Sequence, residues 1–262
     1  MWLAVTGGKG GVGKTTVAVH VHRILGWDAL DLDVTTPNLH LYLDCEEVER
    51  SDVYIPCPKL EDEDACDLCG TCARVCAPGA LVVGRSWDLD PDLCHGCGLC
   101  IESCPNGALA YDRVRIGEVR RYRVSETGAT LTSGSLDVGD RRSRHLVHAL
   151  LEGADDERDL ILDTPAGAGK DVYDVLKAAD AAIAVTQPTP AAYHDLRRLM
   201  RVADRAGIEV VILINRSDLS DSWRRRIEEE VRDPVVEAPT VDDPPRSEVF
   251  REAVERCLEE VV

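Results

Sequence analysis

Two groups of residues have types and spacings that could carry chemistry, and the first lies close to the N-terminus. Its nine residues read Gly-Lys-Gly-Gly-Val-Gly-Lys-Thr-Thr, which fits the phosphate-binding pattern G-x-x-x-x-G-K-[ST]. In such a loop the glycines let backbone N–H groups surround phosphate oxygens, the lysine neutralises their charge and the hydroxyl reaches Mg²⁺. The motif predicts a nucleoside triphosphate site formed by Gly8, Lys9, Gly10, Gly11, Val12, Gly13, Lys14, Thr15 and Thr16.

The second group is a set of eight cysteines in two runs of the form C-x2-C-x2-C-x3-C. Each cysteine of the first run recurs 28 positions later, as Cys66 does at Cys94, so the region is an internal duplication. This is the pattern of two-cluster ferredoxins, in which the fourth cysteine of each run binds the other cluster. We predict two [4Fe–4S] clusters, one held by Cys66, Cys69, Cys72 and Cys104, the other by Cys94, Cys97, Cys100 and Cys76.

Zinc and disulfides are the alternative uses of these thiols. Zn²⁺ also takes four thiolates, but its sites usually show two separated C-x2-C pairs instead of triplets. Disulfides need an oxidising compartment, and nothing in the sequence directs the chain to one. Cys45, Cys57 and Cys257 receive no role, because buried thiols commonly pack as small apolar residues. His95 lies inside the second run, but the set of four cysteines is complete without it.

Regular elements must position the phosphate-binding loop. The apolar run at 2–5 predicts a buried strand leading into it, and 15–25 has the spacing of a helix whose N-terminus faces the anion. More strands are predicted at 29–33, 159–163, 181–186 and 210–215, alternating with helices near 191–206 and 220–231. This alternation specifies an α/β fold, a parallel sheet with helices on both faces, interrupted by a small α+β insert that carries the cysteines.

A second lysine, Lys9, extends the loop motif to K-G-G-x-G-K-[ST]. On these residues the sequence resembles the MinD/ParA family of P-loop ATPases. The resemblance implies an ATP-dependent homodimer in which Lys9 reaches the phosphates of the facing subunit.

Two strand ends resemble the switch segments of that family. The resemblance places Asp33 where it orients the attacking water and Asp31 near the Mg²⁺ shell; hydrolysis requires a group that accepts a hydrogen bond from water in line with the γ-phosphate. The strand closing on Asp163 has the Walker B form, whose carboxylate holds Mg²⁺ through water. The expected catalytic residues are Lys9, Lys14 and Asp33, and those expected around Mg²⁺ are Thr15, Asp31 and Asp163.

Asn215 directly follows a predicted strand and, with Arg216, matches the family's adenine-binding position. An amide can donate and accept hydrogen bonds at once, which suits the adenine edge. The alternative interpretation is an asparagine that closes a turn.

Charge and hydropathy exclude other classes. With 48 acidic and 30 basic residues the net charge is -18, which argues against nucleic-acid binding. The scarcity of lysine favours a high-salt cytoplasm, an ordinary acidic protein being the alternative. No stretch approaches the roughly 18 apolar residues of a membrane span, and the tail at 247–262 carries more glutamate than arginine, which disfavours anionic lipid. We therefore expect a cytoplasmic protein without membrane insertion.

The resemblance assigns 1–56 and 114–262 to the ATPase and 57–113 to the ferredoxin-like insert. The combination predicts an ATP-hydrolysing iron–sulfur protein that couples its nucleotide state to electron transfer or to delivery of Fe–S clusters. Its redox partner or cluster acceptor is not named by the sequence. One alternative is a MinD/ParA-like positioning ATPase with structural or redox-sensing clusters, and another is a ferredoxin with a vestigial P-loop.

Overall fold

The structure, a computed structural model, describes all 262 residues of the chain. The chain forms two compact units. The first unit contains residues 1–51, 119–135 and 146–262, and the second contains 52–118 and 136–145. The chain therefore passes between the units four times.

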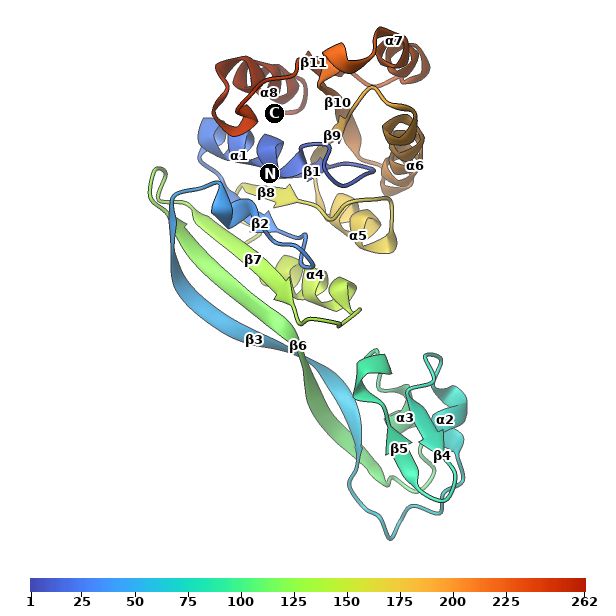
Figure 1. Cartoon of the computed structure of the whole chain (residues 1–262). Coiled ribbons are helices and arrows are strands. Elements are labelled where there is room, and N and C mark those ends of the chain that lie inside the picture. Colours follow the sequence, from blue (N-terminus) through green and yellow to red (C-terminus); the bar gives the residue numbers. More distant parts are fainter. The chain divides into compact units, whose positions relative to one another are not determined.

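Parallel strands form the centre of the first unit (Figure 1). They belong to a nine-stranded sheet of order β11-β10-β9-β1-β8-β2-β7-β6-β3, in which neighbours from β11 to β7 pair in parallel. Their bounds are β1 (Trp2–Thr6), β2 (Asp28–Asp31), β7 (Thr130–Leu136), β8 (Leu160–Asp163), β9 (Ala181–Thr186), β10 (Glu209–Asn215) and β11 (Val235–Ala238). The strands β1, β8, β9 and β10 are almost wholly buried, as their continuous apolar runs predict.

Helices cover both faces of this sheet. They are α1 (Lys14–Leu25), α4 (Ser143–Glu152), α5 (Lys170–Ala178), α6 (Pro190–Ala206), α7 (Asp221–Glu230) and α8 (Glu248–Val261). Helices α1 and α8 pack together on one face, and α5 and α6 pack together on the other (Figure 1). The predicted α/β fold is thus confirmed. The acidic tail at 247–262 forms α8, and apolar residues of this helix, including Phe250 and Cys257, are buried in the core.

Local signals explain where the helices begin and end. Helix α6 starts with Thr189, whose hydroxyl accepts a hydrogen bond from the Ala192 N–H at 3.3 Å, followed by Pro190 in the first turn. These are favourable residues at the positions before and at the start of a helix. The helix ends at Gly207, which has a φ of 74°, a conformation that glycine adopts without steric cost.

The second unit carries the cysteine runs between two long strands, β3 (Cys45–Leu60) and β6 (Leu109–Val124). Its other elements are short: α2 (Thr71–Val75), β4 (Leu81–Val83), β5 (Trp87–Leu89) and α3 (Leu99–Glu102). Strands β3 and β6 each continue from one unit into the other. The sequence pattern did not predict them, because β3 is mostly exposed and polar and β6 interleaves apolar with charged residues, so neither forms an apolar run.

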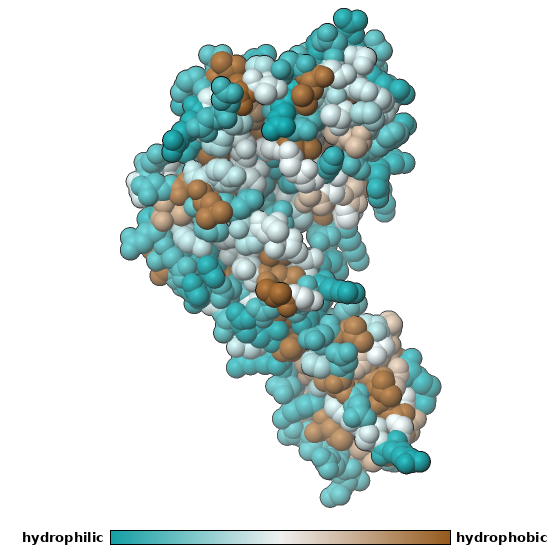
Figure 2. Space-filling model, viewed as in Figure 1, coloured by the Kyte–Doolittle hydropathy of each residue, from teal (hydrophilic) through white to brown (hydrophobic).

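Hydrophilic side chains dominate the visible face of the molecule, interrupted by smaller apolar patches (Figure 2). None of the helices combines the length and the apolar character that crossing a bilayer requires.

Candidate functional site

The phosphate-binding loop joins β1 to α1, so the N-terminus of α1 points to the loop. Gly13 ends the loop with a φ of 107°, and a Cβ at this position would lie 2.6 Å from the Asn215 Nδ2. A Cβ on Gly8 would lie 2.5 Å from the backbone of Asp195 in α6. Glycine is therefore required at both positions, one for its backbone conformation and one for close packing. The resulting loop leaves N–H groups available for an anion at a helix N-terminus.

The two lysines of the loop differ in exposure. Lys14 opens α1 and is only 7% exposed, whereas Lys9 is exposed. Thr15 and Thr16 follow in the first turn of α1, and both are half-buried. A buried lysine can act only inside its own loop, whereas the exposed one can reach another molecule.

Two of the predicted magnesium residues, Asp31 and Asp163, lie at the carboxyl ends of β2 and β8, and the third, Thr15, lies in the first turn of α1. The Thr15 hydroxyl donates a hydrogen bond to the Asp163 Oδ2 at 2.8 Å. The other carboxylate oxygen, Oδ1, is buried and has no hydrogen-bond partner. Asp31 accepts hydrogen bonds from the backbone N–H groups of Asn38 at 2.9 Å and Leu39 at 3.0 Å.

The electrostatics of this pair fit a divalent cation. Burial, together with the charge of Asp31, raises the pKa of Asp163 to about 8, against the hydrogen bond from Thr15 and the charge of Lys14. Burial raises the pKa of Asp31 to about 6, against the hydrogen bonds from Leu39 and Asn38. Mg²⁺ takes oxygen ligands, and a bound cation favours the charged form of both carboxylates. The orphaned Asp163 Oδ1 and the Thr15 hydroxyl are thus suitable groups for the Mg²⁺ shell.

Asp33, the residue predicted to orient water, follows β2 and is half-buried. Its Oδ1 accepts hydrogen bonds from the hydroxyls of Thr35 at 3.1 Å and Thr36 at 3.2 Å. Its backbone N–H donates to the Asp31 Oδ1 at 3.3 Å. Asp33 therefore stands beside the aspartate pair, with its carboxylate engaged by its own turn, and its catalytic role stays a prediction.

Asn215 and Arg216 stand at the end of β10. The Asn215 Nδ2 donates to the Val12 carbonyl at 2.8 Å, so this amide holds the phosphate-binding loop. Arg216 adopts a φ of 54°. The adenine contacts stay a prediction. The sequence motif did not identify Gln187, whose Nε2 donates to the Gly11 carbonyl at 3.4 Å, because no local pattern marks a residue that reaches the loop from so far along the chain.

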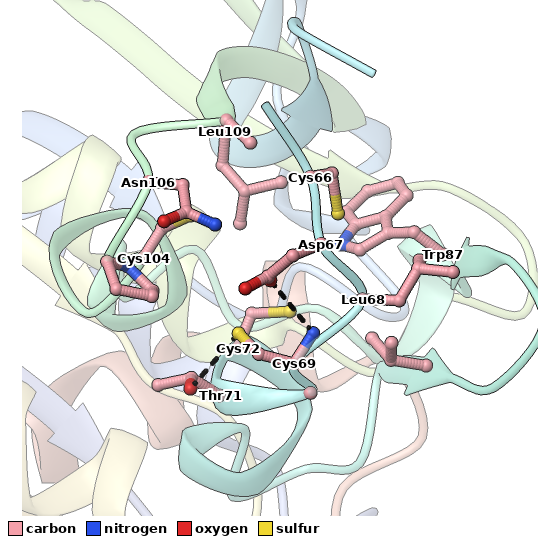
Figure 3. A pocket seen from close by; sticks show the side chains of 14 residues that line it. Cys66, Asp67, Leu68, Cys69, Thr71, Cys72, Trp87, Cys104, Asn106 and Leu109 are labelled. Atoms are coloured by element: carbon pink, nitrogen blue, oxygen red, sulfur yellow. Dashed lines mark hydrogen bonds between the residues drawn. The ribbon is translucent and has the colours of Figure 1, made fainter. Parts of the chain in front are cut away.

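The cysteines of the second unit border two cavities. Figure 3 shows the first cavity, with sulfur atoms from both halves of the duplication around it. The first cavity is lined by Cys66, Cys69, Cys72 and Cys104, and the second by Cys94, Cys97, Cys100 and Cys76. These are the two crossed sets that the spacing predicts.

The geometry of the thiols suits a cluster. Four cysteines surround each cavity. Four thiolates around a cavity are the donor set of a [4Fe–4S] cluster. Tight loops bring the thiols there: Gly70 and Gly98 precede α2 and α3 with φ values of 69° and 73°. Ligation by the individual cysteines stays a prediction.

One protein family matches a short segment of the chain, and two relatives match most of it. A family described as "4Fe-4S binding domain" matches residues 87–110, which contain the second cysteine run. The uncharacterized protein MJ0579 of Methanocaldococcus jannaschii is 31% identical over 228 residues, 84% of this chain and 82% of the relative. The uncharacterized protein MJ0578 of the same organism is 31% identical over 227 residues, 84% of this chain and 80% of the relative.

Solved structures of two MinD proteins are similar in fold to this chain. The cell division ATPase MinD of Pyrococcus furiosus has a TM-score of 0.55 at 16% identity and covers 100% of this chain and 99% of its own. The septum site-determining protein MinD of Pyrococcus horikoshii OT3, complexed with Mg-ADP, has a TM-score of 0.57 at 17% identity. The match covers 99% of this chain and 95% of the MinD chain. The chain therefore belongs to the family of MJ0579 and MJ0578, and it combines the fold of the MinD/ParA P-loop ATPases with a 4Fe–4S binding domain.

Proposed function

We propose that this protein is an Mg²⁺-dependent ATPase with two [4Fe–4S] clusters, in which the nucleotide state controls electron transfer through the iron–sulfur unit. The observation that carries the proposal is the path of the chain. It passes four times between the units, and its last passage runs through α4 into β8, which ends at Asp163. A change at the nucleotide site therefore acts on segments that continue into the iron–sulfur unit.

The residues of the first unit have distinct roles in this proposal. The N–H groups of the glycine loop and Lys14 bind the phosphates, and Thr15, Asp31 and Asp163 hold Mg²⁺, which neutralises phosphate charge. Asp33, whose carboxylate accepts hydrogen bonds from Thr35 and Thr36, would orient the attacking water. The burial of Lys14 and the aspartate pair supports these roles, because water-excluded charges interact more strongly.

Dimerisation is the proposed role of the other lysine. Lys9 is exposed although it belongs to the same loop as the buried Lys14. Its position supports a contact with the phosphates bound by a facing subunit, which would close an ATP-dependent homodimer. The nucleotide states then differ in the contacts between subunits, and such a difference supplies the free energy for a conformational change.

Electron transfer is favoured over delivery of clusters by the crossed cysteine sets. Each cavity draws cysteines from both halves of the duplication. The release of one cluster would loosen the loops that hold the other, so the arrangement suits resident clusters. Each [4Fe–4S] cluster would accept and donate one electron. The redox partner stays unidentified.

The test uses the full chain, purified without oxygen. The proposal expects about eight iron atoms per chain and Mg²⁺-dependent ATP hydrolysis that Lys14→Ala abolishes. It also expects the midpoint potentials to differ between the ADP complex and the complex with a non-hydrolysable ATP analogue. Lys14→Ala is the control, since nucleotides should leave its potentials unchanged. Identical potentials in the two complexes of the wild-type protein would overturn the coupling, and loss of iron on ATP binding would favour cluster delivery.

A further inference from the structure

The duplication places different charges at matching positions of the two cysteine loops. Asp67 follows Cys66 in the first run, and His95 follows Cys94 in the second. Asp67 is exposed and lines the first cavity, whereas His95 lines the second. Figure 3 shows the Asp67 side chain among the cysteines, where its carboxylate accepts a hydrogen bond from the Cys69 N–H at 3.1 Å. No acidic residue lines the second cavity.

A buried cation stands beside the second loop. Arg142 belongs to the segment 136–145, outside the duplication, and is 4% exposed. Its Nη1 donates to the carbonyls of Pro91 at 2.9 Å and Cys94 at 3.3 Å. Its counter-ion Asp140 accepts from the Nε at 2.8 Å. The guanidinium therefore lies between this carboxylate and the second loop, with its positive charge toward Cys94.

The first loop has only a weaker equivalent of this contact. Arg74 donates its Nη1 to the Cys69 carbonyl at 2.8 Å, but Arg74 is exposed. Water and salt screen an exposed charge, whereas a buried charge acts through a lower dielectric. The buried Arg142 should therefore have a larger electrostatic effect on its loop than Arg74 has on the first.

We propose that the buried Arg142, with a smaller contribution from the exposed Asp67, makes the two clusters electrochemically unequal, with the more positive reduction potential at the set Cys94, Cys97, Cys100 and Cys76. Reduction adds one negative charge to a cluster. A nearby carboxylate opposes that charge and a buried guanidinium favours it, and charge and hydrogen bonding are among the factors that set cluster potentials. A reducing electron is then held preferentially at the second set. This inference rests on the proposed function only for the presence of both clusters.

The experiment is a redox titration of the full chain without nucleotide, followed by electron paramagnetic resonance. The wild-type protein should show two transitions. Asp67→Asn should move the more negative transition to a more positive potential by a small amount, because its carboxylate is exposed. Arg142→Gln should move the more positive transition further, to a more negative potential, because its guanidinium is buried. Each substitution should reduce the difference between the two midpoint potentials, and the double variant should reduce it further.

Matched controls separate charge from folding. Arg142→Lys keeps the positive charge, so the midpoint potential of the more positive transition should stay close to its wild-type value. Asp140→Asn removes the counter-ion and should shift the same transition in the positive direction, which loss of structure alone would not do. Asp88→Asn, an exposed carboxylate outside both cavities, should change neither transition, and Arg74→Gln should change the first only slightly.

Two results would overturn the inference. In the first, Asp67→Asn and Arg142→Gln shift the midpoint potentials of the two transitions no more than the control Asp88→Asn does. The other is a shift of the same transition, in the same direction, by both substitutions. A single transition with about four irons per chain would instead overturn the presence of two clusters, on which the proposed function depends.

Discussion

Asp31 and Asp163 stand directly opposite each other on the neighbouring parallel strands β2 and β8. Their exposed fractions are 0% and 1%. Two buried carboxylates at adjacent positions repel each other when both are charged, and burial already disfavours either charge. The pair is therefore costly without a cation, and this cost gives the metal-free protein a specific dependence on pH.

The free energy of unfolding of the metal-free protein is expected to fall as pH rises between about 4 and about 8. The pKa of Asp31 is raised from 3.8 to about 6 and that of Asp163 from 3.8 to about 8, chiefly by burial. In that window the folded protein keeps protons that the unfolded chain has lost, so raising the pH favours unfolding. Thermal unfolding in a chelator at several pH values measures the effect.

Asp163→Asn is the matched variant for this prediction, because an amide keeps the shape and does not titrate. Its melting temperature should depend less on pH across the same window. Addition of Mg²⁺ and ADP to the wild-type protein should also flatten the dependence, since a bound cation favours both charged carboxylates. Equal slopes for the wild type and Asp163→Asn would contradict the electrostatic coupling of the pair.

Asp33→Asn is expected to lower the rate of ATP hydrolysis by about 100-fold, the lower end of what a positioned catalytic group contributes. The affinity for Mg²⁺ and ATP should stay within about twofold of the wild type, because Asp33 acts on water instead of on the phosphates. Steady-state hydrolysis and calorimetric titration measure the two quantities. Glu259→Gln, at an exposed carboxylate on α8, is the control. A parallel loss of binding and hydrolysis would assign Asp33 to nucleotide binding.

Asn215→Ala should weaken ATP binding by up to about 10-fold, the equivalent of one hydrogen bond of about 1.4 kcal/mol. The substitution removes the buried bond from Asn215 to the Val12 carbonyl at 2.8 Å, so the phosphate-binding loop loses its support. Gln187→Ala removes a longer and exposed bond of 3.4 Å to the Gly11 carbonyl and should matter less. Titration with ATP compares the variants. A larger effect from Gln187→Ala would show that the loop is held from the other side.

The parts of the fold that were predictable are those with a local signal. Buried parallel strands read as continuous apolar runs, such as Val210 to Ile214. The glycine loop and the cysteine runs are motifs whose spacing encodes their geometry, so the crossed arrangement around the two cavities could be predicted from positions 66 to 104 alone.

The parts that were not predictable depend on distant residues. Strand β3 is exposed along most of its length, and β6 interleaves apolar with charged residues, so neither strand leaves a continuous apolar run. Arg142 donates to the carbonyl of Cys94, 48 positions earlier in the chain, and no sequence motif predicts this contact. The division at 57–113 stays a prediction, since the compact unit found here begins at Asp52, ends at Glu118 and also takes in 136–145.

Leu68 also could not be singled out from the sequence. The two halves of the duplication place different residues, Leu68 and Gly96, in the same left-handed backbone conformation. Leu68 has a φ of 56°, and its counterpart Gly96 has a φ of 68°. The left-handed conformation costs a side-chain-bearing residue about 1–2 kcal/mol, while glycine adopts it freely but loses about 0.5–1 kcal/mol in chain entropy. Leu68→Gly should therefore stabilise the protein by up to about 1 kcal/mol, measured by unfolding in denaturant without oxygen.

A side chain added at the matching glycine of the second run should lower the stability of the protein. A Cβ on Gly96 would lie 3.1 Å from the Pro56 carbonyl oxygen, in addition to the strain of its φ, so Gly96→Ala should destabilise the protein. Leu68 is 39% exposed and lines the first cavity, so its replacement also removes some side-chain packing, and this loss opposes the gain. A lower stability for Leu68→Gly would mean that the leucine side chain contributes more by covering the cavity than its backbone conformation costs.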